Sequence, residues 1–249
     1  MARVLLAGES WSIATTHLKG FDQLQQSTFE IGCPDFLAAL HDAGHEVTHL
    51  LHHEVASQFP LTTKELDEYD VVVLSDIGAN TLLLHPDVAL RSKRTPNRLV
   101  LLADWVRAGG GLFMAGGWMS FQGFGAQANY FDTPLSDVLP VNLLPYDDRL
   151  EVPEGVHPSL TSFSHPITVG MDVVWPAILG QHKLTAKHDA QVLAEANDRP
   201  ILATRAVGAG RTVALGTDIA PHWATPEFLA WEQYGVLCDR IVRWAAGDI

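Results

Sequence analysis

Cysteine is scarce in this sequence. Its 249 residues include only Cys33 and Cys238, which are too few for a disulfide framework or a four-cysteine zinc site. The sequence also lacks a P-loop and a Gly-x-Gly-x-x-Gly motif after the first expected strand. Dinucleotide and nucleoside triphosphate sites are therefore not expected, and we predict no cofactor.

Basic residues and long apolar runs are in short supply as well. The chain has 16 Lys and Arg against 29 Asp and Glu, a formal net charge of −13. Proteins that bind nucleic acid or anionic membranes are normally basic, so neither partner is expected. No apolar run is long enough to span a bilayer, and the chain opens on what reads as a strand rather than a leader. These absences favour a cytoplasmic protein whose partner is a small molecule.

Apolar residues, by contrast, make up 47% of the chain and are arranged in a regular order. Four apolar runs are typical of buried strands, at residues 2–8, 46–51, 71–76 and 112–116. Three helices are expected between them, at 34–45, 62–70 and 97–111. This alternation predicts an α/β protein with a mostly parallel sheet and helices on both faces.

The second half of the sequence is less regular. Residues 132–189 are rich in Pro, His and Asp and indicate a loop-rich insertion. Residues 201–218 are expected to form a late β-hairpin, and residues 225–247 a long C-terminal helix. No internal repeat or linker divides the chain, so residues 1–249 are predicted to form a single domain.

Ligands bind beyond the carboxyl ends of the strands in open parallel sheets. Four segments follow strand ends here and are rich in polar and aromatic residues, at 8–22, 75–86, 116–123 and 216–223. The first is expected to be a long loop, and long loops tend to be functional. The convergence of the four segments predicts a cleft at one edge of the sheet.

Four residues of these segments are candidates for acid–base catalysis, namely Glu9, Asp76, Asp218 and His222. Three of them have a structural alternative as well. Glu9 could fix neighbouring loop amides, Asp76 could cap a helix, and His222 could stack on Trp223. The candidates for substrate binding lie in the same segments and are Ser10, Trp11, Thr16, His17, Lys19, Asn80, Trp118, Ser120 and Gln122.

A divalent metal is an open alternative to chemistry by these side chains alone. Nitrogen and oxygen ligands are available from His17, Asp76, His165 and His222. None of these residues forms a pair with the i, i+4 spacing of a helical zinc site. No metal ligand is therefore assigned.

Six stretches carry a resemblance to a known family: "GESW", "THLKGFD", "YDVVVLSDIGANTLLLHP", "GGGLFMAGGWMSFQG", "HPIT" and "GTDIAPHWATPEFLAWEQYG". Together they are similar to the putative glutamine amidotransferase family, over essentially the whole chain. This family is a branch of the class I glutamine-amidotransferase-like superfamily, which has ThuA-like proteins among its relatives. The resemblance implies a flavodoxin-like three-layer sandwich around a mostly parallel sheet, in agreement with the fold expected from the residues.

The true class I amidotransferases place a catalytic cysteine in a Gly-x-Cys-x-Gly turn after a strand. The corresponding turn in this sequence is residues 116–120, and Trp118 stands at the cysteine position. Tryptophan cannot form the thioester that glutamine hydrolysis requires. Ser120 and Cys33 are the alternative nucleophiles, with His222 as the base for the serine. The resemblance therefore implies the fold more directly than it implies glutaminase activity.

Two hypotheses for function follow. In the first, the protein is an enzyme, of a hydrolase or lyase kind, that acts on a small polar metabolite such as a sugar derivative or an amide. In the second, it is a non-catalytic ligand-binding or assembly protein, because tryptophan-rich loops also suit the interface of a homo-oligomer. An active glutaminase is the least favoured interpretation.

Overall fold

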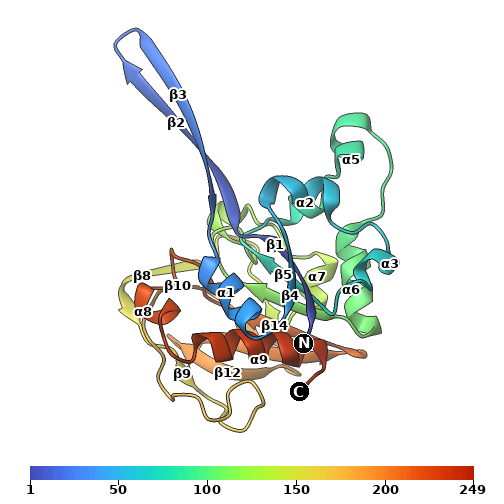
Figure 1. The fold of residues 1–249 in the computed structure, drawn as a ribbon, viewed down its shortest axis with the longest axis vertical. Helices are drawn as coiled ribbons and strands as arrows, with labels where there is room; N and C mark the ends of the chain where they lie inside the picture. The colour runs from blue at the N-terminus through green and yellow to red at the C-terminus, as the bar shows by residue number, and fades with distance from the viewer.

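The computed structural model describes all residues from Met1 to Ile249. Its centre is an eight-stranded sheet with the strand order β4-β1-β5-β6-β14-β13-β12-β9 (Figure 1). In that order the strands are β4 (Glu46–Leu50), β1 (Arg3–Gly8), β5 (Val71–Ser75), β6 (Gly111–Ala115), β14 (Gly210–Leu215), β13 (Arg199–Val207), β12 (Gln191–Ala196) and β9 (Ser159–Leu160). The pairings from β4 to β14 are parallel, and those from β14 to β9 are antiparallel. The predicted parallel strands and the late hairpin are confirmed.

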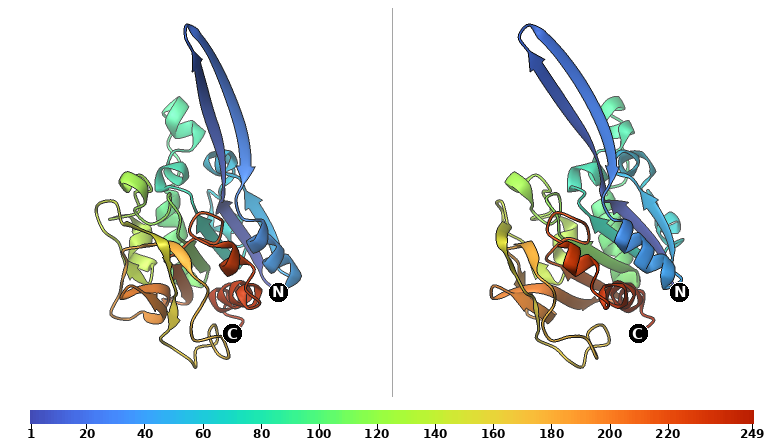
Figure 2. Two further views of the ribbon diagram at one scale, coloured as in Figure 1. Left: turned by 90° about the vertical axis from the view of Figure 1, so that its left-hand side faces the viewer. Right: turned by 60° about the vertical axis from the view of Figure 1, so that its left-hand side comes forward.

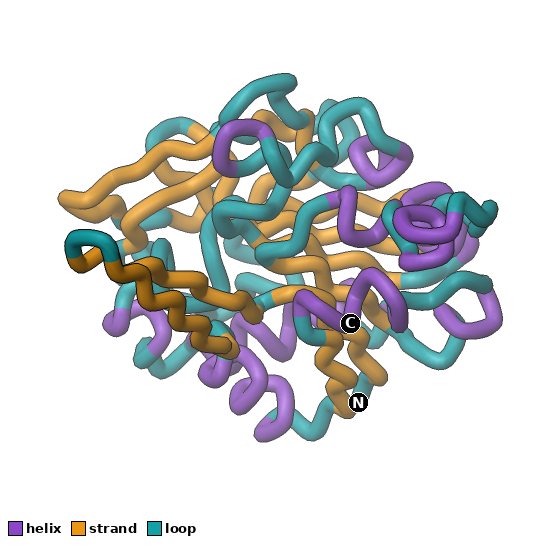
Figure 3. Tube along the Cα trace, turned by 90° about the horizontal axis from the view of Figure 1, so that it is seen from above, coloured by secondary structure: helices purple, strands orange, loops and turns teal.

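Helices cover both faces of the sheet, which confirms the three-layer arrangement (Figure 3). One layer contains α1 (Pro34–Asp42) and α9 (Tyr234–Ala246), which contact each other. The other layer contains α2 (His52–Gln58), α3 (Thr63–Leu66), α4 (Ala79–Leu83), α6 (Arg98–Ala108) and α7 (Pro134–Val138). The chain also forms α5 (Pro86–Arg91) and a short 3₁₀ turn, η1 (Phe124–Ala126).

Each central strand serves both layers, because successive side chains of a strand point to opposite faces. In β5, Val71 and Val73 join the core beneath α1 and α9, while Val72 and Leu74 join the core beneath α6. Both faces are therefore buried, which explains the continuous apolar runs of the sequence. None of the helices combines the length and apolar character that a membrane span requires.

The segment expected to be a long loop after β1 is instead a protruding β-hairpin, which we call the arm. It consists of β2 (Ser10–Lys19) and β3 (Asp22–Ile31), paired antiparallel along their whole length. The arm projects away from the body of the molecule in both views of Figure 2. Gly20 opens its two-residue turn with a φ of 64°, which glycine adopts without steric cost. The prediction of a loop is wrong because neither face of these strands is buried. Polar side chains therefore occur on both faces, and the apolar–polar alternation that reveals a strand is absent.

The region at 132–189 is more regular than the sequence indicates. Besides α7 and β9 it holds β7 (Val141–Asn142), β8 (Arg149–Val156), β10 (Ile178–His182) and β11 (Thr185–Ala186). Strands β8 and β10 form an antiparallel ribbon, and β7 pairs with β11. These strands are short or irregular in register, so they leave only a weak signal in the sequence.

The C-terminal helix is interrupted, in contrast to the single helix expected at 225–247. A short helix, α8 (Pro226–Leu229), precedes α9, and residues 230–233 lie between them. The interruption lets Trp231 pack against Trp175, with ring centroids 5.6 Å apart. It also lets the Trp231 indole N–H donate a hydrogen bond of 3.0 Å to Asp172. Long-range contacts of this kind decide where a helix breaks and are invisible to local periodicity.

Candidate functional site

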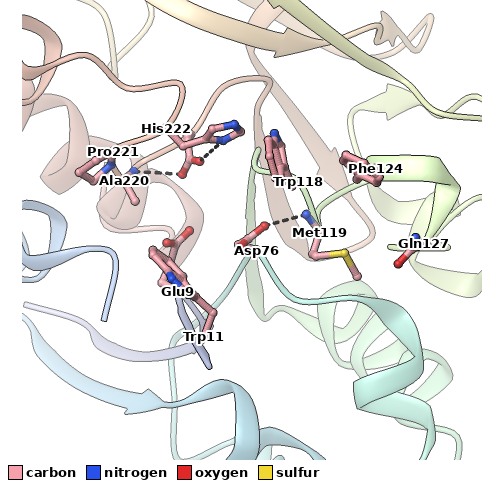
Figure 4. A pocket seen from close by; sticks show the side chains of 11 residues that line it. Glu9, Trp11, Asp76, Trp118, Met119, Phe124, Gln127, Ala220, Pro221 and His222 are labelled. Atoms are coloured by element: carbon pink, nitrogen blue, oxygen red, sulfur yellow. Dashed lines mark hydrogen bonds and ion pairs between the residues drawn. The ribbon is translucent and has the colours of Figure 1, made fainter. Parts of the chain in front are cut away.

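A cleft of about 520 Å³ opens at the carboxyl ends of β1, β5, β6 and β14 (Figure 4). These are four neighbouring parallel strands, and each contributes the residues that directly follow it. The lining residues are Glu9, Trp11, Asp76, Trp118, Met119, Phe124, Gln127, Asp218, Ala220, Pro221 and His222. The predicted convergence of the segments after these strands is therefore present in the structure.

Glu9 lies at the floor of the cleft, directly after β1. Its backbone has a φ of 48°, a left-handed conformation that turns the chain sharply out of the sheet. The Ser75 hydroxyl donates a hydrogen bond to Glu9 Oε1, and only 1% of Glu9 is exposed. Burial and the negative charges of Asp218 and Asp76 raise the pKa of Glu9 well above its usual value.

Asp76 has the same left-handed conformation at the end of β5, with a φ of 46°. Its Oδ1 accepts a 2.7 Å hydrogen bond from the backbone N–H of Met119. Its own backbone N–H donates to the hydroxyl of Ser120 at 3.0 Å. Gly117 lies so close that a Cβ there would stand 3.0 Å from Asp76 Oδ1. Burial raises the pKa of Asp76, although the Met119 N–H opposes the shift.

Asp218 and His222 come from the loop after β14. Asp218 Oδ1 accepts a 3.0 Å hydrogen bond from Ala220 N–H, and Asp218 Oδ2 lies 3.7 Å from His222 Nδ1. Burial, followed by the charge of Asp76, raises the pKa of Asp218 well above its usual value. Burial lowers the pKa of His222. The imidazole therefore stays neutral to lower pH than a free histidine, and the buried carboxyl groups hold their protons to higher pH than free carboxyl groups.

One wall of the cleft is aromatic, and hydrogen bonds to the carboxylate of Glu151 hold two indole rings in place. The Glu151 side chain accepts hydrogen bonds from the indole N–H of Trp118 at 3.3 Å and of Trp223 at 2.9 Å. His222 lies between these indoles, stacked on Trp223 at 5.4 Å and edge-on to Trp118 at 4.4 Å. Arg149 sits 3.9 Å above the Phe124 ring. Glu151 thus holds two indoles and, through them, the orientation of His222.

A fully buried ion pair supports the turn beneath this wall. His182 Nδ1 and Asp148 Oδ1 are 2.9 Å apart, with neither side chain exposed. Asp148 also accepts the backbone N–H groups of Gln122 and Gly123. His182 Nε2 lies 3.0 Å from the carbonyl oxygen of Gly117. Since that carbonyl only accepts, the hydrogen bond requires His182 to donate from Nε2.

A family model described as "Putative glutamine amidotransferase" matches residues 3–246. The chain belongs to this family. No curated protein matches the chain.

Two solved structures are similar to this family member throughout. Cytoplasmic protein STM1381 from Salmonella typhimurium LT2 is 40% identical, with a TM-score of 0.94 and coverage of 98% of this chain and 99% of that chain. Cytoplasmic protein STM3548 from Salmonella typhimurium is 38% identical, with a TM-score of 0.94 and 98% coverage of both chains. A ThuA-like protein from Parabacteroides merdae is 12% identical, with a TM-score of 0.62 and coverage of 99% and 90%. The last similarity concerns the fold alone.

Several expected binding residues of this family member lie outside the cleft. Thr16, His17 and Lys19 stand on the outer part of the arm and are exposed, because the segment that carries them is a hairpin and not a loop folded over the sheet. Ser10 is buried at the base of the arm, where its hydroxyl lies 3.2 Å from His52 Nδ1. Asn80 is exposed on α4. The structure corrects the expected placement of these five residues.

Two other expected binding residues, Ser120 and Gln122, have structural roles beside the cleft. The hydroxyl of Ser120 is occupied by the Asp76 backbone and only 2% of the residue is exposed, so it is not placed as a nucleophile. Gln122 is buried, and its Oε1 accepts a 3.0 Å hydrogen bond from Phe131 N–H. Both residues hold the turn that follows β6. The supporting residues Asp148, Glu151 and His182 were missed because they belong to the region expected to be loop.

The metal and thiol alternatives find no common site in this family member. His17 is on the arm, and His165 is buried against Trp244, with ring centroids 5.4 Å apart; neither residue lines the cleft. No group of three or more His, Cys, Asp or Glu side chains is arranged to hold a metal ion. Cys33 and Cys238 are buried in the apolar core, where burial raises the pKa of both thiols. Neither cysteine lines the cleft.

Proposed function

We propose that this member of the family is an enzyme that transfers protons to and from a small polar metabolite, a sugar derivative, in the cleft. One observation carries the proposal: in a single cleft, burial raises the pKa of Glu9 and Asp218 and lowers the pKa of His222. The pKa values of the carboxyl groups and of the imidazole are thus displaced towards each other, which favours a proton donor and a proton acceptor side by side in the cleft. Groups with pKa values displaced in opposite directions are the usual basis of acid–base catalysis.

The geometry supports a distinct role for each group. Glu9, fixed at the floor by the Ser75 hydroxyl, is the proton donor. His222 is the base, and Asp218, whose Oδ2 lies 3.7 Å from its Nδ1, orients the imidazole. Asp76 is oriented by the N–H of Met119 and accepts a hydrogen bond from a substrate hydroxyl.

The walls of the cleft favour a sugar derivative over a simple amide. Trp11, Trp118 and Phe124 present ring surfaces, while the floor presents carboxyl groups. The faces of a sugar ring carry C–H groups that pack on aromatic rings, and its hydroxyls hydrogen-bond with carboxyl oxygens. A cleft of about 520 Å³ lies within the size range of small-molecule sites.

Glutamine hydrolysis is not part of the proposal. The turn after β6 contains Trp118 and no cysteine, and Cys33 and Cys238 are buried in the core. Without a thiolate at the cleft there is no group to form the glutamyl thioester. We propose the cytoplasm as the compartment, as the names of the two Salmonella relatives describe them.

The experiment that tests this function begins with binding. Melting temperatures of the purified protein are measured with a panel of sugars, sugar phosphates, sugar acids and small amides, and ligands that stabilise the protein are then assayed for turnover. We expect stabilisation by sugar derivatives and a turnover that Glu9→Gln and His222→Asn each lower by about 10²–10⁴-fold. The matched controls Glu30→Gln and His17→Asn make the same changes on the exposed arm and should retain wild-type turnover.

The pH profile provides a second readout. Turnover should rise with pH through the lowered pKa of His222, as the base becomes neutral, and fall at higher pH through the raised pKa of Glu9, as the donor ionises. The residual turnover of His222→Asn should no longer rise with pH at the low-pH end. The residual turnover of Glu9→Gln should no longer fall at the high-pH end. Full activity in both variants, or stabilisation by amides alone, would contradict the proposal.

A further inference from the structure

We propose that the arm joins two copies of this chain through the free edge of β2. The arm is an unbroken ladder of ten residue pairs, from Ser10 opposite Ile31 to Lys19 opposite Asp22. At about 3.4 Å per residue it reaches about 34 Å from the sheet. Both views in Figure 2 show it standing clear of the body. Two-stranded hairpins of this kind are at best marginally stable in water, so the arm requires a partner surface.

Only the base of the arm is anchored to the body. Phe29 stacks on the ring of His52 at 5.7 Å, and the hydroxyl of Ser10 accepts a 2.8 Å hydrogen bond from the His52 backbone N–H. Beyond this base every residue of both strands is exposed. The anchor fixes the direction of the arm and leaves its outer part uncovered.

The outer part carries apolar side chains that the body does not bury. Leu18 is 75% exposed, Leu24 is 59% exposed, and Phe21, at the turn, extends fully into solvent. Exposed apolar groups gathered on one projecting element indicate a surface that another molecule covers.

The edge of β2 lacks the devices by which proteins block unwanted strand pairing. From Ser10 to Leu18 it contains neither proline nor a charged residue other than His17, and its ladder with β3 has no bulge. Charges, prolines and bulges are the usual protection of an exposed edge. A regular edge of this length without them is suited to accept another strand.

The charges of the arm favour a second copy of this chain as the molecule that supplies the added strand. The chain has a net charge of −13, but the arm carries only Lys19, Asp22 and Glu30 besides His17. Two copies of an acidic protein therefore repel least where their arms meet. In a symmetric dimer with a two-fold axis, the same surface of both copies meets at the interface. Each strand of the arm can therefore be checked for charge clashes with the same strand of the second copy.

The two edges of the arm differ in this test. Antiparallel pairing of β2 with the β2 of the partner puts Lys19 opposite the uncharged end that begins at Ser10. The same pairing of β3 puts Asp22 opposite Ile31 and Glu30 opposite Gln23. It thereby gathers the four acidic side chains of the two arms along one seam between two copies of an acidic protein, which is electrostatically unfavourable. The geometry thus favours β2 and predicts a four-stranded antiparallel ribbon between the two copies.

Assembly at the arm has a consequence for the cleft. Trp11 is the second residue of β2 and also lines the cleft beside Glu9. The partner copy consequently lies near the cleft mouth, and its position is linked to that of Trp11. This consequence rests on the proposed function, whereas the pairing of the arms does not.

The test compares two substitutions that face each other across the arm. Thr15 and Gln26 are directly paired and exposed, so Thr15→Lys and Gln26→Lys place the same charge on opposite edges. The mass of each purified full-length protein is measured by sedimentation and native mass spectrometry up to about 50 µM, a range that resolves concentration-dependent association. We expect the wild type at twice the chain mass of 27.2 kDa. Thr15→Lys should weaken the dimer by at least about 10-fold and Gln26→Lys by less than about 2-fold.

A shortened arm separates the dimer from the fold. In this variant residues 14–27 are replaced by Asn-Gly, which closes the hairpin after the Ile13–Thr28 pair. It should remain folded by circular dichroism, because the anchor at Phe29 is kept, and should be a monomer. A wild-type monomer throughout the concentration range overturns the proposal and leaves a different protein as the partner of the arm. A dimer that survives the shortening, or an equal effect of the two lysines, overturns the assignment to β2.

Discussion

The cleft and the arm both begin within two residues of the end of β1, but they differ in which residue types they bury. In the cleft, Glu9 and Asp218 are ionisable groups with at most 4% of the residue exposed. On the arm, Leu18 and Phe21 are large apolar groups in water. Folded proteins normally place these residue types the other way round. Each inversion costs stability, and together they mark the two places where this chain meets another molecule.

The largest effect is expected where the cleft depends on buried charge. Replacing His182 with Leu leaves the carboxylate of Asp148 in the core without its partner, which should lower the free energy of unfolding by about 3–5 kcal/mol. The control is His188→Leu, since His188 is 93% exposed in its pair with Asp189. Denaturant unfolding measures both variants. Equal stability of the two would show that the buried pair does not support the cleft.

Glycines at the cleft and on the arm give the next comparison. Gly117 has a φ of 134°, and a Cβ there meets Asp76, so Gly117→Ala should cost about 1–3 kcal/mol and displace the Asp76 carboxyl. Gly20 also has a positive φ, but a Cβ there has no neighbour within 4 Å. Gly20→Ala should therefore cost less, about 1 kcal/mol, and only within the arm. Thermal unfolding and the turnover assay are measured for both variants. If Gly20→Ala lowers turnover as much as Gly117→Ala does, the arm and the cleft are not independent in this way.

A third prediction concerns the cost of the buried carboxyl groups. The pKa of Glu9 is higher in the folded than in the unfolded state, so its stabilising contribution is present below the unfolded pKa and is lost as the pH rises towards the folded value. Glu9→Gln should therefore stabilise the protein by about 0.5–2 kcal/mol at pH 8 and by less at pH 4.5. Calorimetry at both pH values tests this, with the exposed Glu30→Gln as the control. A larger gain at pH 4.5 than at pH 8 would refute the sign of the effect.

The smallest effect is expected on the arm itself. Leu18→Ser removes an exposed apolar group that contacts no core, so the stability of the dilute protein should change by less than about 0.5 kcal/mol. Its dimerisation should weaken, because the same group is expected to be covered in the dimer. Melting curves at low concentration and sedimentation at high concentration measure the two quantities. A clear loss of stability at low concentration would mean that Leu18 already packs within one chain.

The residues at the strand ends show how far the sequence leads towards the site. Glu9, Asp76, Trp118, Asp218 and His222 could be placed in one cleft because parallel strands bring their carboxyl ends to one edge. Their partners could not be foreseen in this way. Glu151 and His182 lie in irregular strands with little periodicity, and their contacts join positions more than 30 residues apart in the chain. Thr16, His17 and Lys19 were assigned to the cleft only because an exposed hairpin has no apolar face to reveal it.

The sequence by itself determined the α/β layers, the parallel strands β1, β5 and β6, and the edge at which the cleft opens. These features depend on local apolar periodicity and on the geometry of parallel strands, both of which are properties of short segments. Only the tertiary structure decided that His222 is held by two indoles, that the Asp148–His182 pair lies beneath it, and that the chain after Glu9 turns outward as an arm. Such features arise from contacts between distant segments and from the loss of water around buried groups, which no short stretch of sequence encodes.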